Sequence, residues 1–172
     1  MTEGRENQAA VSGMTITPEQ KEVKKATEKA MNLLLQQDRT EKELEERLYR
    51  TGFSEHASEC AMNYVKSFGY VDDFRYASNY IAFHKRNRSK KEIRYKLMKK
   101  GVDTGTIALA MEEYENADEQ MAICCLAEKR LRGRSLSELE YEEKNKLIAY
   151  LARKGFSVPQ IKHALSERWG LL

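Results

Sequence analysis

Residues 93–102, IRYKLMKKGV, decide the fold of this chain. Two aliphatic residues, Ile93 and Leu97, stand four positions apart and therefore share one face of a helix. Gly101 follows four positions later and can adopt the left-handed conformation that ends a helix, and the apolar Val102 comes directly after it. The stretch predicts a helix with one buried face that ends in a tight corner.

The same phrase occurs twice more, as LEERLYRTGF at residues 44–53 and as LIAYLARKGF at residues 147–156. Its glycine recurs after 49 residues, from Gly52 to Gly101, and again after 54 residues, at Gly155. A self-similar period near fifty residues indicates an array of one supersecondary unit that gains stability by stacking on its neighbours. We interpret the repeated aliphatic and glycine residues as core and corner positions.

Capping signals stand at the expected starts of helices. A Ser or Thr followed three residues later by Glu or Gln, as at Thr40 and Ser89, is typical of a capping box. With only two prolines, the chain is predicted to be all-α, with three tandem three-helix repeats in an elongated, curved, solenoid-like array. The predicted helices span residues 18–36, 40–51 and 54–67, then 72–86, 89–100 and 105–115, then 117–132, 139–154 and 158–169.

The first residues, 1–16, are polar and irregular, and we interpret them as a disordered N-terminal tail. The repeats are predicted at residues 17–68, 69–116 and 117–172. No apolar run approaches the roughly 20 residues that span a bilayer, and no apolar segment of signal-peptide type is present. We expect a cytoplasmic protein without membrane contact, and three units with distinct ends favour a monomer.

Signatures of common enzyme classes are missing from the sequence. It contains no phosphate-cradling glycine loop, no His-Glu-x-x-His and no nucleophile elbow. The paired carboxylates Asp72 and Asp73 stand at a predicted helix start, where acids accept hydrogen bonds from free backbone N–H groups. We therefore interpret them as caps, and we expect no catalytic residue, no metal ligand and no cofactor.

Charge is distributed unevenly along the chain. The net charge is only +3, yet residues 84–101 hold nine Lys or Arg against one acid, while residues 102–145 hold five bases against eleven acids. Such separation of sign predicts a polyanionic partner, or a partner with its own alternating surface. The acidic start of the third repeat could meet a basic patch of that partner.

The basic stretch is the strongest candidate for a binding surface. A solvated helix face normally mixes signs, because like charges at helical spacing cost a few tenths of a kcal/mol per pair. We expect this surface to bind phosphates or acidic side chains, whereas Tyr76, Tyr80 and Phe83 have the spacing of core residues. The predicted contact residues are Lys85, Arg86, Arg88, Lys90, Lys91, Arg94, Lys99 and Lys100, with Arg153, Lys154 and Lys162 as a lesser set.

Three segments resemble the bacterial RecX family: GYVDDFRYA at residues 69–77 with the basic turn after it, residues 93–102, and LARKGFS at residues 151–157. The resemblance covers residues 17–170 in register. It implies a non-enzymatic, negative regulator of the RecA recombinase that lies in the groove of the RecA filament on single-stranded DNA. Such a regulator inhibits ATP turnover, strand exchange and coprotease activity and promotes filament disassembly, in DNA recombination, DNA repair and the SOS response.

The expected partner is therefore the RecA filament, and single-stranded DNA is a further candidate. Two alternatives remain open: a nucleic-acid-binding helical protein without sequence specificity, and a helical-repeat scaffold for protein interaction. No helix carries the cluster of Asn, Gln and Arg that reads base edges, which argues against sequence-specific binding. A period near fifty, rather than 34, argues against a tetratricopeptide scaffold.

Overall fold

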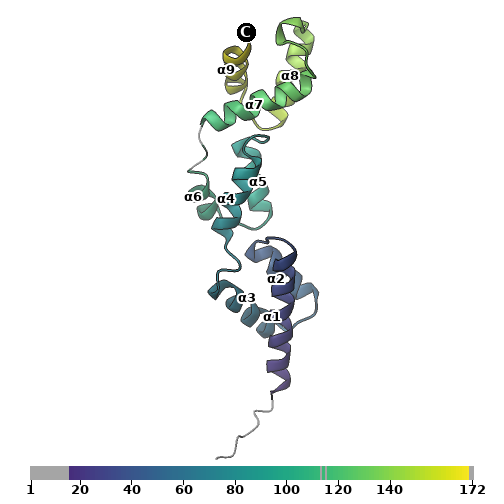
Figure 1. The fold of residues 1–172 in the computed structure, drawn as a ribbon, viewed down its shortest axis with the longest axis vertical. Coiled ribbons are helices and arrows are strands. Elements are labelled where there is room, and N and C mark those ends of the chain that lie inside the picture. The colour runs from purple at the N-terminus through teal and green to yellow at the C-terminus, as the bar shows by residue number, and fades with distance from the viewer. Residues whose placement is uncertain (1–15, 113, 115, 171–172) are drawn as a thin grey trace, which may run out of the picture.

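The computed structural model describes residues 16–112, 114 and 116–170, and every regular element within these ranges is a helix. Of the predicted tail, residues 1–15 lie outside the described residues. The helices stack into an elongated rod, with the first helix at one end and the last at the other (Figure 1). The predicted all-α repeat fold is confirmed. Among the described helices, none has the length and apolar character that crossing a lipid bilayer requires.

The described helices follow one another in three groups of three, which we call the first, second and third units. The first unit contains α1 (Pro18–Gln36), α2 (Glu41–Arg50) and α3 (Glu55–Ser67). The second contains α4 (Asp73–His84), α5 (Lys90–Lys99) and α6 (Thr104–Ala110). The third contains α7 (Asn116–Leu131), the 3₁₀ turn η1 (Leu136–Glu138), α8 (Tyr141–Arg153) and α9 (Val158–Trp169). The predicted boundaries at 68/69 and 116/117 stay predictions.

One helix is shorter than expected. The sequence pattern predicts a helix over 105–115, but α6 ends at Ala110. The reason lies at Tyr114, which is buried and donates its hydroxyl to the carbonyl oxygens of Lys85, at 3.1 Å, and Arg88, at 2.9 Å. The chain leaves the helix so that this ring can reach the turn between α4 and α5.

The capping signals act largely as predicted. Thr17, Thr40 and Ser157 each form a reciprocal capping box with the residue three positions on. Ser89 accepts a hydrogen bond from the backbone N–H of Glu92 at 3.1 Å, but the Glu92 carboxylate pairs with a neighbouring arginine instead of returning to the cap.

Each unit has its own hydrophobic cluster, and the three clusters share no residue. In every unit the first helix packs extensively on the third. The repeated aliphatic pairs contribute to these clusters, as predicted: Leu44 and Leu48, Ile93 and Leu97, and Leu147 and Leu151 are buried. Burial of an aliphatic side chain contributes about 1.5–3 kcal/mol, so each phrase stabilises its own unit.

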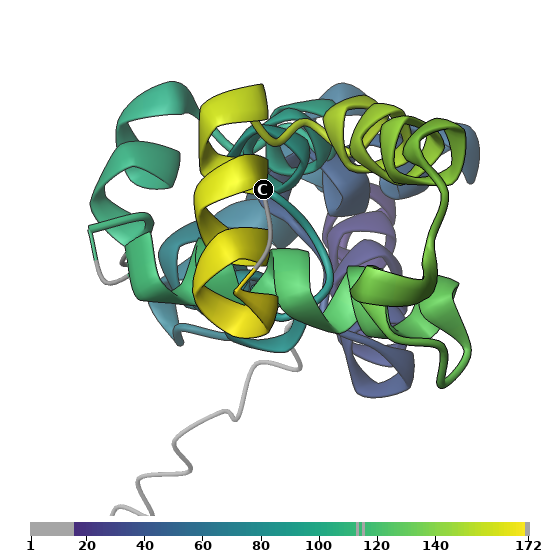
Figure 2. The ribbon, with the colours of Figure 1, turned by 90° about the horizontal axis from the view of Figure 1, so that it is seen from above.

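The units join through the ends of their middle helices. The hydroxyl of Thr40, at the start of α2, donates to the carbonyl oxygen of Lys100, at the end of α5, over 2.6 Å. Ser89, at the start of α5, donates to the carbonyl oxygen of Lys154, at the end of α8, over 2.7 Å. The helices α2, α5 and α8 therefore follow one another along one side of the rod (Figures 1 and 2). We call these contacts the first and second joints.

The repeated glycine has a second role at the joints. Gly52, Gly101 and Gly155 all have positive φ, between 85° and 94°. A Cβ at Gly101 would overlap the side chain of Lys42, and one at Gly155 would lie 2.5 Å from Ser89 Oγ, whereas Gly52 has nothing within 4 Å. The glycine thus ends a helix in all three units. In two of them, its lack of a side chain also leaves room for a residue of the neighbouring unit.

Acidic side chains complete both joints. Asp73 Oδ1 accepts from the backbone N–H of Glu41 at 2.9 Å, and Glu119 Oε1 accepts from that of Lys90 at 3.1 Å. Each N–H belongs to the first turn of a middle helix, where no intrahelical partner exists. Asp72 caps its own helix by accepting from the N–H of Arg75 at 2.9 Å. The interpretation as a cap of the helix that follows is confirmed for Asp72, whereas Asp73 accepts from the start of α2 in the neighbouring unit.

Candidate partner-binding surface

The exposed face of α5 carries three of the predicted contact residues. Ile93 and Leu97 are fully buried, and at 100° per residue Lys91, Arg94 and Lys99 point away from them. All three are exposed, and none of them forms an ion pair with a carboxylate of the described residues. Their charges therefore face solvent uncompensated.

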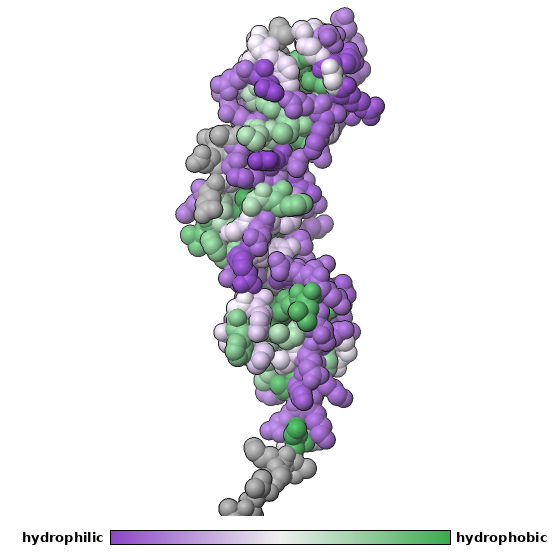
Figure 3. All heavy atoms as spheres, viewed as in Figure 1, coloured by the Kyte–Doolittle hydropathy of each residue, from purple (hydrophilic) through white to green (hydrophobic). Residues whose placement is uncertain are grey.

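Two apolar side chains lie between these cations. Tyr95 is 57% exposed and Met98 is 49% exposed on the same side of α5. Hydrophilic side chains cover much of the right-hand edge of the rod, the side on which α2, α5 and α8 lie (Figure 3). The α5 face, defined as Lys91, Arg94, Tyr95, Met98 and Lys99, thus combines positive charge with an aromatic ring and a thioether. This combination suits an acidic surface that also offers apolar contacts.

Three other predicted contact residues are ion-paired within the protein. Lys85 contacts Asp118 at 3.1 Å, Arg88 contacts Glu92 at 2.7 Å and Lys100 contacts Glu43 at 2.8 Å. The Lys85 and Lys100 pairs connect different units, 33 and 57 residues apart in sequence. The Lys85 and Lys100 pairs hold neighbouring units together, whereas the Arg88 pair lies within the second unit, and contact of these three residues with a partner stays a prediction.

Lys90 and Lys154 lie against aromatic rings. The Lys90 ammonium is 5.2 Å from the centre of the Tyr114 ring, and that of Lys154 is 5.9 Å from the centre of the Tyr150 ring. A cation over an aromatic face is stabilised by the ring quadrupole. Both lysines are half-buried at the second joint, so their role there is at least partly structural.

The pKa shifts of two side chains agree with the distinction between residues engaged within the protein and residues exposed to solvent. Burial alone would lower the pKa of Lys100, but the hydrogen bond to Glu43 and the contact with Tyr76 raise it above the usual lysine value. Burial, followed by the nearby charge of Arg88, lowers the pKa of His84. The charged form of Lys100 is therefore favoured at the first joint, and the neutral form of His84 is favoured where it packs.

The remaining predicted residues lie in different places. Arg86 is exposed in the turn between α4 and α5, and Arg153 is exposed on α8 at the position that corresponds to Lys99 on α5. Lys162 is also exposed, but it belongs to α9, on the other side of the rod from α8 (Figure 1). Its membership of one surface with the α5 face stays a prediction.

Two acids at the start of the third unit are engaged within the protein. Asp118 pairs with Lys85, and Glu119, only 7% exposed, accepts from the Lys90 N–H and from the Gln160 amide. Both acids hold the second unit against the third.

Sequence reasoning missed one basic segment. Residues 129–134 read KRLRGR, four cations without an acid, at the end of α7 and in the turn that follows. The segment falls within residues 102–145, whose net negative charge concealed it. A shorter window would have found it. Lys129 Nζ donates to Asn87 Oδ1 at 2.8 Å, which brings this segment beside the basic turn of the second unit.

The rings near the basic stretch do not behave alike. Tyr76 and Tyr80 are partly buried and pack against the cluster of the second unit, as their spacing predicts. Phe83 is 79% exposed, so the expectation that it is a core residue is wrong. It lies edge-on to His84, with ring centres 5.0 Å apart, because the turn of the helix carries it past the buried face defined by Ala77 and Ile81.

Comparison with known proteins identifies the family. One family model, described as RecX, first three-helix domain, matches residues 26–64, and another, RecX, third three-helix domain, matches residues 112–165. Regulatory protein RecX of Vibrio campbellii is 32% identical over 140 residues, which make up 81% of this chain and 88% of the relative. This chain belongs to the RecX family.

Other RecX proteins agree. Regulatory protein RecX of Clostridium botulinum is 28% identical over 144 residues, 83% of this chain and 68% of the relative. The crystal structure of RecX from Lactobacillus salivarius superimposes with a TM-score of 0.74 at 28% identity, over 86% of this chain and 96% of that one. The three-helix domains named by the RecX models correspond to the first and third units, with the α5 face between the matched segments.

Proposed function

We propose that this RecX-family chain is a non-enzymatic, negative modulator of the RecA recombinase. It binds in the groove of the RecA filament on single-stranded DNA, inhibits ATP turnover, strand exchange and coprotease activity, and promotes net disassembly of the filament. Family membership supports a regulatory role, and the resemblance described above supports the partner.

The observation that carries the proposal is the α5 face. Lys91, Arg94 and Lys99 are exposed and uncompensated at the middle of an elongated rod, with Tyr95 and Met98 between them. An extended body can follow a helical groove, and a central basic face can contact acidic protein surface there. Buried aromatic or aliphatic anchors among charges are the usual core of a protein interface.

Regulation requires no catalytic group in this scheme. A ligand that binds one filament state more tightly than another shifts the population toward that state, by an amount set by the difference in affinity. Asp72 and Asp73 are adjacent carboxylates that could resemble an acid–base pair. Each accepts a hydrogen bond from a backbone N–H at the start of a helix.

The test measures RecA ATPase activity on single-stranded DNA during titration with the wild-type protein and with Lys91→Glu/Arg94→Glu. Wild-type protein is expected to inhibit below one molecule per RecA protomer, and the double variant is expected to inhibit at least about tenfold more weakly, since central charged contacts carry about 1.4 kcal/mol or more. Circular dichroism verifies that the variant keeps its helices.

The matched control is Lys25→Glu/Lys29→Glu, which reverses two exposed cations of α1 without an ion pair among the described residues. It produces the same change in net charge far from the α5 face and is expected to inhibit like wild type. Full inhibition by Lys91→Glu/Arg94→Glu would rule out the α5 face as the contact. No inhibition by wild type, together with tight DNA binding, would favour the plain nucleic-acid binder.

A further inference from the structure

A basic groove, separate from the α5 face, opens beside the second joint. Lys129, Arg130 and Arg132 of the third unit line it together with Tyr150 of α8, and its volume is about 530 Å³. None of the three cations forms an ion pair with a carboxylate of the described residues. Clustered cations in a recess focus a positive potential that attracts anions.

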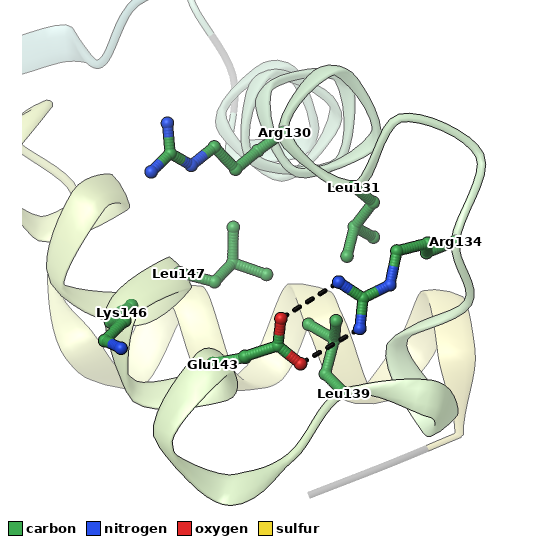
Figure 4. A pocket seen from close by; sticks show the side chains of 7 residues that line it. All are labelled: Arg130, Leu131, Arg134, Leu139, Glu143, Lys146 and Leu147. Carbon is green, nitrogen blue, oxygen red and sulfur yellow. Dashed lines mark hydrogen bonds and ion pairs between the residues drawn. The ribbon is translucent and has the colours of Figure 1, made fainter.

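The neighbouring Arg134, unlike the three cations of the groove, is paired with a carboxylate. Glu143 accepts two hydrogen bonds from its guanidinium, at 2.9 and 3.0 Å, and the pair lies across a smaller pocket (Figure 4). Hydrogen bonding from Arg134 accordingly lowers the pKa of Glu143. Arg130 points away from this pair in Figure 4 and has no such partner among the described carboxylates. The same six-residue segment thus contains one compensated arginine and three uncompensated cations.

Two cations from different parts of the chain lie close to the ring of Tyr150. The guanidinium carbon of Arg130 is 5.3 Å from the ring centre, and the Lys154 ammonium is 5.9 Å from it. Two positive charges around one ring repel each other unless an anion is close, and the ring offsets only part of that repulsion. The arrangement holds Arg130 and Lys154 ready for a shared negative group.

The backbone at Arg132 provides independent support. Arg132 has a φ of 51°, and it is the only residue other than glycine with positive φ in the described part of the chain. A residue with a side chain is strained in this left-handed region, whereas glycine is not. An arginine at this strained position is understandable if its side chain has a binding role, because strained residues cluster at functional sites.

We propose that the groove lined by Lys129, Arg130, Arg132 and Tyr150 binds the phosphodiester backbone of single-stranded DNA. Arginine guanidinium groups match phosphate oxygens in geometry and charge, and the groove has three basic residues and no acid in its lining. A single strand can bend its backbone into a recess, whereas a duplex presents its phosphates on a wide, stiff surface. The contact is independent of sequence because no lining residue is suited to read base edges.

The site is distinct from the α5 face and goes beyond the proposed function, since it needs no RecA. The test is the fluorescence anisotropy of labelled oligothymidine mixed with the intact protein at several salt concentrations. Arg130→Glu/Arg132→Glu is expected to bind about tenfold more weakly than wild type. The slope of log affinity against log salt is expected to fall by about 0.7 for each phosphate that the variant no longer neutralises.

A second variant separates binding from folding. Arg132→Gly removes the side chain and relieves the strained backbone, so it is expected to raise the unfolding temperature while weakening oligothymidine binding several-fold. Lys25→Glu/Lys29→Glu, the charge-matched control in α1, is expected to retain wild-type affinity within about twofold. Equal losses of affinity in the control and groove variants would overturn the proposal, and so would unchanged binding by both groove variants.

Competitors identify the ligand. Unlabelled oligothymidine is expected to displace the probe far better than poly-glutamate at equal charge concentration, and better than a DNA duplex. Equal displacement by poly-glutamate would show a general anion site, and stronger duplex binding would show a different nucleic-acid site; either result overturns the proposal. RecA ATPase inhibition is measured on the same variants, so failure here is distinguishable from failure of the α5 face.

Discussion

The hydroxyl of Ser89 joins two helices whose ends lie 65 residues apart in sequence: it donates to the carbonyl oxygen of Lys154 at 2.7 Å and accepts from the N–H of Glu92 at 3.1 Å. Ser89 is fully buried. One small side chain therefore satisfies the start of α5 and the end of α8 together. Thr40 does the same for α2 and α5, so the joint is itself a repeated element.

Ser89→Ala is expected to destabilise the protein by about 2 kcal/mol, because removing an N-cap costs about 1 kcal/mol and removing a buried hydrogen bond costs about as much again. Urea denaturation followed by circular dichroism measures the change. Ser157→Ala removes an exposed cap that acts only within α9, so this control is expected to be destabilised by about 1 kcal/mol. Equal destabilisation of the two variants would contradict the role of Ser89 at the joint.

The three repeated glycines are expected to respond unequally to alanine. Gly52→Ala costs about 1 kcal/mol from backbone strain alone, since nothing lies near its missing Cβ. Gly101→Ala and Gly155→Ala add a clash with the neighbouring unit, worth about 1–3 kcal/mol more. Thermal unfolding of the three variants side by side measures the difference, and a uniform effect would show that the joints tolerate the extra methyl group.

Tyr114→Phe is expected to loosen the basic turn between α4 and α5. The variant keeps the buried ring but leaves the carbonyl oxygens of Lys85 and Arg88 without their hydroxyl donor. Trypsin is expected to cut after residues 85, 86 or 88 several-fold faster, because local opening of the turn exposes these bonds more often. Tyr141→Phe, at a side chain that is 78% exposed, serves as the control and is expected to be cut at the wild-type rate.

Asp73→Asn is expected to stabilise the protein at neutral pH. Burial, together with the charges of Glu41 and Asp103, raises the pKa of Asp73 despite its hydrogen bond from the Glu41 N–H. A carboxyl whose pKa is raised in the folded state destabilises that state as pH rises through the pKa, and this penalty is absent below the unfolded value of about 3.9. The asparagine oxygen still accepts the N–H bond without the charge.

Unfolding temperatures of wild type and Asp73→Asn between about pH 3 and pH 7 check the sign. The advantage of the variant is expected to grow from acid to neutral pH and to vanish where Asp73 is protonated. A larger advantage at low pH would show that the carboxylate stabilises the first joint.

The scaffold was predictable from the sequence because it depends on local signals. The spacing of Ile93, Leu97 and Gly101 alone predicts a buried helix face and the end of that helix. Ser89 predicts where the helix starts. The predicted helices match the observed ones within one or two residues, apart from α6. There the hydroxyl of Tyr114 donates to carbonyl oxygens 26 and 29 residues away in sequence, and no local pattern predicts this contact.

The surface was less predictable because ion pairing depends on tertiary packing. Lys85 and Lys100 have the same local context as Lys91 and Lys99, yet the first two meet Asp118 and Glu43 of other units. Spacing along the chain does not show which lysines of a cluster face an acid. The proposed groove was missed for a related reason, since its cations belong to a segment whose overall charge is negative.

The separation of the three hydrophobic clusters has a mechanical consequence. Because the joints consist of hydrogen bonds, ion pairs and cation–aromatic contacts at helix ends, changing the angle between neighbouring units would break polar contacts, and no shared apolar core would be opened. Each unit can stay rigid while the rod flexes at two defined places. A chain built in this way can adjust its pitch to a helical partner at small energetic cost.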